Sequence, residues 1–171
     1  GNVRGVQALV LTPTRELAIQ VADAITGFAE HTKAQVIAIY GGSSYVPQLR
    51  ALKQGAQVVV GTPGRVMDMI ERGALDLSNL RVFVLDEADE MLSMGFAEDI
   101  EVIATTVPKD RLTALFSATM PTAIARVAAT HLRDPLRIEV TSAASTVSTI
   151  EQTYAVVPFR HKVGALSRVL A

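Results

Sequence analysis

The 171-residue sequence contains no cysteine, and it has no long apolar run. The first absence excludes disulfide bonds and zinc sites built on cysteine, and it favours a cytoplasmic location. No apolar run reaches the roughly 18 residues that a membrane-spanning helix needs, so no membrane partner is expected. The chain begins with Gly1 instead of Met and shows no apolar signal core. We therefore expect it to be a piece of a longer protein.

Charge is also scarce, because charged residues make up only 19% of the sequence and the formal net charge is −1. A protein that holds nucleic acid by bulk charge is usually basic, so any contact with nucleic acid here must be local. Hydrophobic residues reach 49%, which excludes a disordered tail and is typical of a domain with a sizeable core.

Short apolar runs alternate with helical patterns along most of the chain. Most of the runs are apolar throughout, as expected for strands of a parallel sheet that is covered on both faces. The last run alternates apolar and polar residues and is predicted to be an edge strand. The predicted strands are Ala8–Leu11, Val36–Tyr40, Val58–Val60, Val82–Leu85, Leu112–Phe116 and Leu136–Val140.

Between the runs, apolar residues recur at intervals of three and four, which predicts amphipathic helices. The repeated strand–helix order indicates a doubly wound α/β domain, whose ligands gather at the carboxyl ends of the strands. Four phenylalanines have core spacing and are interpreted as packing residues, and the three histidines lack ligand spacing. These residues are Phe28, Phe83, Phe96 and Phe116, and His31, His131 and His161.

The composition changes after Val140. Residues 141–150 are rich in serine, threonine and alanine and are predicted to be a linker. Beyond them, Thr153–Val157 has the pattern of a strand and Arg160–Ala171 that of a helix. This pair is too small to build its own core. We expect it to open a second domain and to make few contacts with the first.

Two adjacent carboxylates, Asp86 and Glu87, follow the buried run Val82–Leu85. In phosphoryl transfer an aspartate at such a position holds Mg²⁺, and a neighbouring acid positions or activates water. The alternative interpretation is a solvated acidic turn after a strand.

Two further turns join a strand to a helix and carry an arginine. In the first, Thr12 or Thr14 fits the N-cap position and Arg15 adds charge. In the second, Thr62 fits the N-cap, and Gly64 leaves room for a sugar–phosphate backbone. Each turn alone is more often explained by ordinary helix capping.

Weaker signals occur in two other turns. Ser117 and Thr119 are small hydroxyl residues between a predicted strand and a predicted helix. Their hydroxyls can link the carboxylates to a neighbouring element through hydrogen bonds. Gly41-Gly42 indicates a tight turn or a close approach of the backbone to a ligand.

Taken together and in this order, the motifs resemble those of the DEAD-box RNA helicases, whose naming motif is Asp86-Glu87-Ala88-Asp89. The resemblance covers about Ala8 to Ala171, and over Tyr40–Pro121 the sequence is most similar to bacterial cold-shock-type members. It implies a RecA-like doubly wound parallel sheet with helices on both faces, truncated at the N-terminus. The other matching motifs are Pro13–Ala18, Gly41-Gly42, Thr62–Arg65, Met94–Phe96 and Ser117–Thr119.

The resemblance also implies a role for each matching residue. Asp86 would coordinate Mg²⁺ through water, and Glu87 would position the water that attacks ATP. Asp89 would contact Ser117 and Thr119, and so link ATP hydrolysis to RNA strand separation. Contacts to the RNA backbone, which carry little sequence preference, would come from Pro13, Thr14, Arg15, Gly42, Thr62, Gly64 and Arg65.

One part of the family pattern is missing, because the sequence contains no G-x-x-x-x-G-K-[ST] phosphate loop. The resemblance places that loop upstream of Gly1 and the second helicase domain of the same parent chain downstream. Residues 1–140 would then be a partial first helicase domain, 141–150 the interdomain linker and 151–171 the start of the second domain. We expect the parent to be an RNA-stimulated ATPase and this chain alone to be inactive.

Two other functions remain open on the sequence. One is a catalytically silent module that holds RNA or a partner protein; a phosphate loop upstream in the parent would argue against it. The other is a DNA translocase of the same superfamily. The spelling Asp-Glu-Ala-Asp argues against the translocase, since DNA-directed relatives more often have histidine in the last place.

Overall fold

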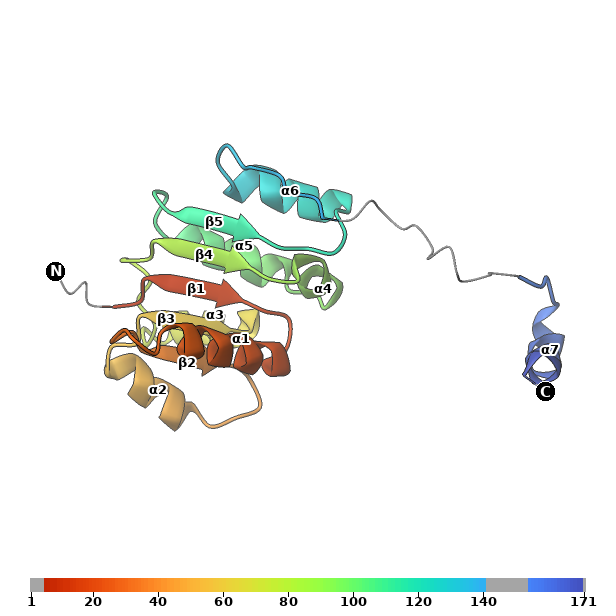
Figure 1. Ribbon diagram of the computed structural model, residues 1–171, viewed down its shortest axis with the longest axis horizontal. Helices are drawn as coiled ribbons and strands as arrows, with labels where there is room; N and C mark the ends of the chain where they lie inside the picture. Colours follow the sequence, from red (N-terminus) through yellow and green to blue (C-terminus); the bar gives the residue numbers. More distant parts are fainter. Residues whose placement is uncertain (1–4, 141–153, 171) are drawn as a thin grey trace. The chain divides into compact units, whose positions relative to one another are not determined.

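The computed structural model describes residues 5–140 and 154–170, which fall into two units divided between Leu136 and Arg137. The first unit is an open sheet of five parallel strands in the order β2-β3-β1-β4-β5, flanked by helices (Figure 1). This architecture confirms the predicted doubly wound α/β fold. The strands are β1 (Ala8–Leu11), β2 (Val36–Ile39), β3 (Val58–Gly61), β4 (Val82–Leu85) and β5 (Leu112–Leu115). The helices are α1 (Arg15–Phe28), α2 (Tyr45–Lys53), α3 (Pro63–Glu71), α4 (Ala88–Ser93), α5 (Ala97–Thr106) and α6 (Thr122–His131).

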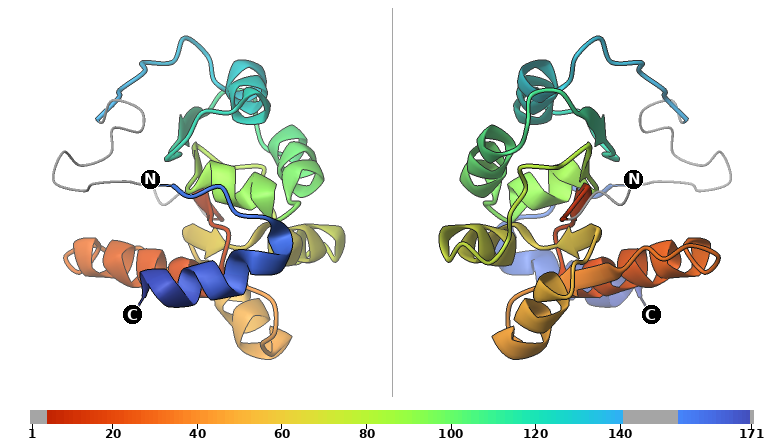
Figure 2. Two further views of the ribbon diagram at one scale, coloured as in Figure 1. Left: turned by 90° about the vertical axis from the view of Figure 1, so that its right-hand side faces the viewer. Right: turned by 90° about the vertical axis from the view of Figure 1, so that its left-hand side faces the viewer.

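Successive strand residues point to opposite sides of the sheet. Because the strands are apolar at most positions, both faces carry apolar side chains, and helices cover both. On one face, Val10 and Val60 pack with Ala18 and Ala22 of α1. On the other face lies the larger core, to which α3, α4 and α5 contribute. Viewed along the strands, α1 lies on one side of the sheet and α3 and α5 lie on the other (Figure 2).

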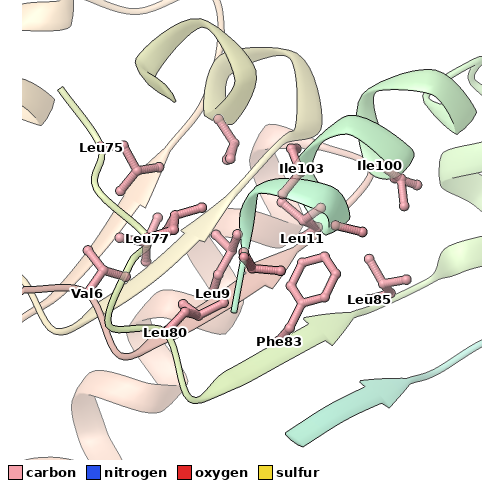
Figure 3. Packing of buried hydrophobic residues seen from close by; sticks show 14 of the residues in the cluster. Val6, Leu9, Leu11, Leu75, Leu77, Leu80, Phe83, Leu85, Ile100 and Ile103 are labelled. Atoms are coloured by element: carbon pink, nitrogen blue, oxygen red, sulfur yellow. The ribbon is translucent and has the colours of Figure 1, made fainter. Parts of the chain in front are cut away.

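The larger core is built on the central strands. Figure 3 shows Phe83 and Leu85 of β4 pointing into the same interior as Leu9 and Leu11 of β1. Ile100 and Ile103 of α5 close this interior from above the sheet, and all six side chains are at most 1% exposed. Each buried side chain of this size contributes about 1.5–3 kcal/mol relative to exposure. The core therefore fixes where β1 and β4 end, and with them the turns that follow.

The predicted edge strand Leu136–Val140 is wrong, because these residues form no strand and their side chains are exposed. Alternating residues form a strand only when a neighbouring strand bonds their backbone, and none of the described strands pairs with this segment. Tyr154–Val157 likewise forms no strand. The packing roles of Phe28 and Phe116 are also wrong, since these side chains are 88% and 59% exposed.

The second unit, within its described residues, contains one short 3₁₀ turn and one helix. The turn is Phe159–His161, and α7 is Lys162–Val169, which agrees with the predicted helix Arg160–Ala171 to within two residues at each end. Most apolar side chains of α7, including Val163 and Leu166, are exposed. The predicted linker at 141–150 lies outside the described residues. None of the helices that the structure describes is long and apolar enough to cross a membrane.

Candidate functional site

The strand register brings the motif turns together at the carboxyl ends of the five strands, which are called the sheet edge below. Ile39, Gly61, Leu11, Leu85 and Leu115 are aligned across the five strands, and each is the last residue of its strand. The following turns therefore leave the sheet side by side, in the spatial order 40–44, 62–65, 12–15, 86–89 and 116–119. This order differs from the order along the chain. It places all the predicted RNA-contacting residues over β2, β3 and β1, and all the predicted ATP-related residues over β4 and β5.

The acidic turn after β4 has an unusual backbone conformation. Glu87 is in the left-handed region, with φ 50° and ψ 51°, and its side chain is exposed at the start of α4. This conformation costs a non-glycine residue roughly 1–2 kcal/mol. The neighbouring Asp86 turns one carboxylate oxygen, Oδ1, back to accept the N–H of Glu87 at 3.1 Å. Its backbone N–H donates to the Leu11 carbonyl, which fixes the backbone of Asp86 to the end of β1.

Asp89 joins α4 to the turn after β5. One of its carboxylate oxygens accepts hydrogen bonds from the hydroxyl of Thr119 at 2.7 Å and from the backbone N–H of Thr119 at 3.0 Å. The backbone N–H of Asp89 donates to Oγ of Ser117, whose hydroxyl in turn donates to the Thr119 carbonyl. The predicted contact of Asp89 with both hydroxyl residues is therefore present in the structure. Its role in coupling stays a prediction.

The hydrogen bonds from Thr119 hold the pKa of Asp89 below its ordinary value of 3.8, with the hydroxyl of Thr119 as the largest cause. A carboxylate with a lowered pKa stabilises the folded state above its unfolded pKa, and this contribution is lost as the pH falls through the folded value. Thr119→Val removes the hydroxyl, so we expect the pKa of Asp89 to rise towards 3.8. The Asp89 carboxyl carbon, followed by NMR between pH 2 and 6, measures it. Thr122→Val, at an exposed position nearby, is the control, and an unchanged Asp89 pKa in Thr119→Val would contradict the assignment.

The turn after β1 presents a helix start and an arginine. Thr14, and not Thr12, is the N-cap of α1, and its hydroxyl oxygen accepts the N–H of Leu17 at 3.2 Å. Thr12 is buried and donates its hydroxyl hydrogen to the Thr14 carbonyl. Arg15 is exposed, and its guanidinium lies 5.1 Å from the ring centroid of Tyr40, the residue directly after β2. Free N–H groups and a cation at a helix start suit a phosphate.

The turn after β3 differs from the sequence prediction in one residue. Pro63 occupies the first turn of α3 and Gly64 is exposed, as the motif predicts. Thr62 is the N-cap, but its hydroxyl makes no capping hydrogen bond to any described residue. Arg65, however, is only 9% exposed and its guanidinium lies inside the protein.

Two residues of the site were missed on the sequence. Gln48 and Tyr45 of α2 contact Arg65, and Gln48 is only 6% exposed. The available signal was a glutamine on the apolar side of a short helix that begins three residues after Gly42. Such a polar residue among apolar ones indicates a buried hydrogen-bond network.

The donor set at the acidic turn fits Mg²⁺ bound together with a nucleotide. Mg²⁺ usually keeps several waters and takes one or two carboxylates plus substrate phosphates. Asp86 and Glu87 supply two carboxylates, and the described ranges 5–140 and 154–170 contain no cluster of three or more acidic, histidine or cysteine ligands. The sequence contains no lysine-bearing phosphate loop for the rest of the nucleotide.

Comparison with known proteins agrees with this geometry. The sequence model of the DEAD/DEAH box helicase family matches residues 1–127. The chain is 52% identical to "ATP-dependent RNA helicase DeaD" of Escherichia coli K12 over 170 residues, which is 99% of this chain and 27% of the relative. It is also 52% identical to the protein of that name from Mycobacterium tuberculosis H37Rv, covering 96% of this chain and 29% of the relative.

Solved structures of similar sequence have the same fold. A DEAD box protein from Methanococcus jannaschii superimposes with a TM-score of 0.77 at 46% identity, over 97% of this chain and 44% of that one. A hypothetical ATP-dependent RNA helicase from Sulfolobus tokodaii gives a TM-score of 0.71 at 40% identity, over 76% of this chain and 39% of that one. The chain thus spans less than half the length of these relatives. It belongs to the DEAD/DEAH box helicase family.

Proposed function

We propose that this chain works as part of an ATP-dependent RNA helicase, in which it supplies the acidic half of the ATP site and part of the RNA surface. The names of its relatives support the activity, and a second helicase domain of the same parent chain is the expected partner. In this proposal 1–140 is a partial first helicase domain, 141–150 a linker and 151–171 the start of the second domain.

The observation that carries the proposal is the division of the sheet edge. The acidic turn lies over β4, and the helix starts that suit phosphates lie over its neighbour β1 and over β3. The backbone N–H of Asp86 donates to the carbonyl of Leu11, which joins the two halves directly. The acidic turn and the helix start after β1 are therefore neighbours across one pair of strands.

Each carboxylate has a separate task in the proposal. Mg²⁺, when bound with ATP, neutralises charge on the β- and γ-phosphates. Asp86 would hold it through water, using the carboxylate oxygen that does not accept the Glu87 N–H. Glu87 would position the attacking water, since it is the neighbouring acid and its side chain is exposed. Asp89, Ser117 and Thr119 would carry the effect of hydrolysis to α4 and the turn after β5.

The RNA surface would hold the backbone and not the bases. The exposed candidates are Arg15, Gly42 and Gly64, and Thr14 and Thr62 are partly exposed beside them. Pro13 is buried and would act by shaping the turn before α1. Contacts of this kind fix the position of a strand without reading sequence. The few charges involved predict a shallow salt dependence, with a slope of about −0.7 for each phosphate contacted in a single strand.

The proposal is tested with the purified full-length protein that contains this chain, expressed in the cytoplasm of its host. Phosphate release is measured with Mg²⁺-ATP alone, with single-stranded RNA and with single-stranded DNA of the same sequence. We expect RNA to stimulate hydrolysis and DNA not to do so. Equal stimulation by DNA would favour a translocase, and no hydrolysis with either would favour a silent binding module.

A further inference from the structure

Arg65 lies inside the protein although it is charged. One terminal nitrogen of its guanidinium donates to Oε1 of Gln48 at 3.3 Å, and the other donates to the backbone carbonyl of Ser43 at 3.1 Å. Its face lies 3.9 Å from the ring centroid of Tyr45. A charged side chain is rarely buried unless it is paired or hydrogen-bonded. Arg65 is held by neutral groups, through two hydrogen bonds and a cation–π contact. All its contacts lie in or next to the turn between β2 and α2.

Gln48 closes the same turn from the side of α2. Its side-chain nitrogen donates to Oγ of Ser43 at 2.7 Å, and it also approaches the carbonyls of Tyr40 and Ser44 at 3.3 and 3.4 Å. The side-chain oxygen of Gln48 accepts from Arg65. Arg65 and Gln48 together therefore hold the backbone on both sides of Gly41-Gly42.

A second layer of contacts fixes Arg65 itself. The hydroxyl of Tyr45 donates to one carboxylate oxygen of Asp68, and Nε of Arg72 donates to the other at 2.7 Å. The Arg72 guanidinium lies 4.8 Å from the Tyr45 ring centroid, so the ring contacts two guanidinium groups. Arg65 and Asp68 lie on one face of α3, and Arg72, the C-cap residue of α3, follows four positions after Asp68 on the same face. The side chains on this face therefore contact Tyr45, the first residue of α2, on its ring and at its hydroxyl.

The turn between β2 and α2 needs these contacts because Gly41 and Gly42 have no side chains that could hold it in place. Gly42 has φ +72°, which glycine adopts readily, and a Cβ at Gly41 or Gly42 would meet no described atom within 4 Å. Both residues are exposed at the sheet edge. Glycine loses more conformational entropy on ordering than any other residue, so a binding surface made of it gains affinity when its neighbours order it beforehand.

We propose that Arg65 is a positioning residue, which orders the Gly41–Ser44 turn from inside together with Gln48 and Tyr45, and does not itself bind a phosphate of the RNA. This inference rests on the proposed RNA-binding function and changes the role expected for Arg65. To reach a phosphate, its guanidinium would have to leave the Ser43 carbonyl and Gln48, whose buried polar groups would then lose their partners.

The two roles predict different behaviour of the full-length protein. Gln48 is neutral and buried, so only a positioning role makes Gln48→Ala weaken RNA binding. We expect Gln48→Ala and Arg65→Ala each to weaken binding about tenfold, as for the loss of one or two buried hydrogen bonds. The double variant should bind no more weakly than Arg65→Ala, because both changes release the same turn. The KM for RNA should rise, and kcat for ATP at saturating RNA should stay within about twofold of the wild-type value.

Salt dependence gives an independent readout. A guanidinium that binds a phosphate contributes about 0.7 to the slope of log affinity against log salt. A positioning residue leaves the slope unchanged. Tyr45→Phe, which removes only the hydroxyl bonded to Asp68, is a milder variant for use if the alanine variants fail to fold. Arg50→Ala removes an exposed arginine from α2 and is the charge-matched control.

The outcomes separate the inference from the proposed function. If the wild-type protein binds no RNA, the proposed function fails. If it binds RNA and Arg65→Ala lowers the salt slope by about 0.7 while Gln48→Ala and Tyr45→Phe bind like wild type, Arg65 is a phosphate ligand and the inference is wrong. Weaker binding in Gln48→Ala or Tyr45→Phe at an unchanged slope, with Arg50→Ala close to wild type, supports it.

Discussion

Glu87→Gln in the full-length protein is expected to slow ATP hydrolysis roughly 10²–10⁴-fold and to leave ATP binding nearly unchanged. The substitution keeps the size of the side chain and removes the negative charge that orients water. Glu87 makes no capping hydrogen bond within α4, and its side chain is exposed, so the change should not disturb the fold. Single-turnover hydrolysis and equilibrium binding of a nucleotide analogue, both in the presence of RNA, measure the two effects separately.

Glu90→Gln is the matched control for this experiment. Glu90 lies in the first turn of α4, three residues after the N-cap Glu87, and is likewise exposed, but it follows the acidic motif and is not among the residues expected to face ATP. It should hydrolyse ATP at close to the wild-type rate. If Glu87→Gln lost nucleotide binding and hydrolysis to the same extent, the role of Glu87 would be structural and the proposed division of tasks between Asp86 and Glu87 would fail.

The strands of the sheet could be predicted from the sequence because their runs are mostly apolar, and no side chain of the central strands β1, β3 and β4 is exposed. The runs Ala8–Leu11 and Val82–Leu85 have the predicted bounds, and three other strands differ from prediction by one residue at one end. An apolar run with polar turns on both sides leaves little freedom in where a buried strand begins and ends. The turns that carry the motifs follow directly from those strand ends.

The segment Leu136–Val140 shows why the same reasoning fails elsewhere. Its alternating pattern is real, but a pattern does not supply the neighbouring strand that must bond the backbone. The packing role predicted for Phe116 is wrong for a related reason. Phe116 follows β5, an outermost strand of the described sheet, and has less of the protein around it. Sequence patterns report what a segment is suited to pack against, and the rest depends on what lies beside it.

Arg65 shows a different limit, which concerns the site. The motif Thr62–Arg65 predicts a cation near the sheet edge, and the cation is there. The direction in which its side chain points depends on Gln48 and Tyr45, which lie 17 and 20 positions earlier in the sequence and carry no charge. A motif gives residue types and spacing, whereas burial is decided by residues outside the motif.

Gly61 and Gly64, which flank Thr62 and Pro63, are expected to respond very differently to a single added methyl group. At Gly61 a Cβ would lie 2.8 Å from the carbonyl oxygen of Ile39 and 2.7–2.8 Å from side-chain carbons of Ile39 and Val66. The oxygen cannot move aside, because it accepts the backbone N–H of Thr62 at the end of the paired strands. Gly61→Ala should therefore lower the free energy of unfolding by about 3 kcal/mol or prevent folding, at the upper end of the cost of overpacking.

Gly64→Ala is the control, three positions away in the first turn of α3. A Cβ there would have Asp99 Oδ2 as its nearest described neighbour, at 3.8 Å, which is an ordinary contact. Alanine also favours a helix over glycine, so this variant should unfold at the same urea concentration as wild type or a slightly higher one. Urea unfolding of the 171-residue chain, followed by circular dichroism, compares the two. Equal urea midpoints for Gly61→Ala and Gly64→Ala would contradict the structure, because β2 and α3 would then have to lie further apart at the end of β3. The turn that carries Thr62 and Gly64 would also be less closely packed than the proposed RNA surface requires.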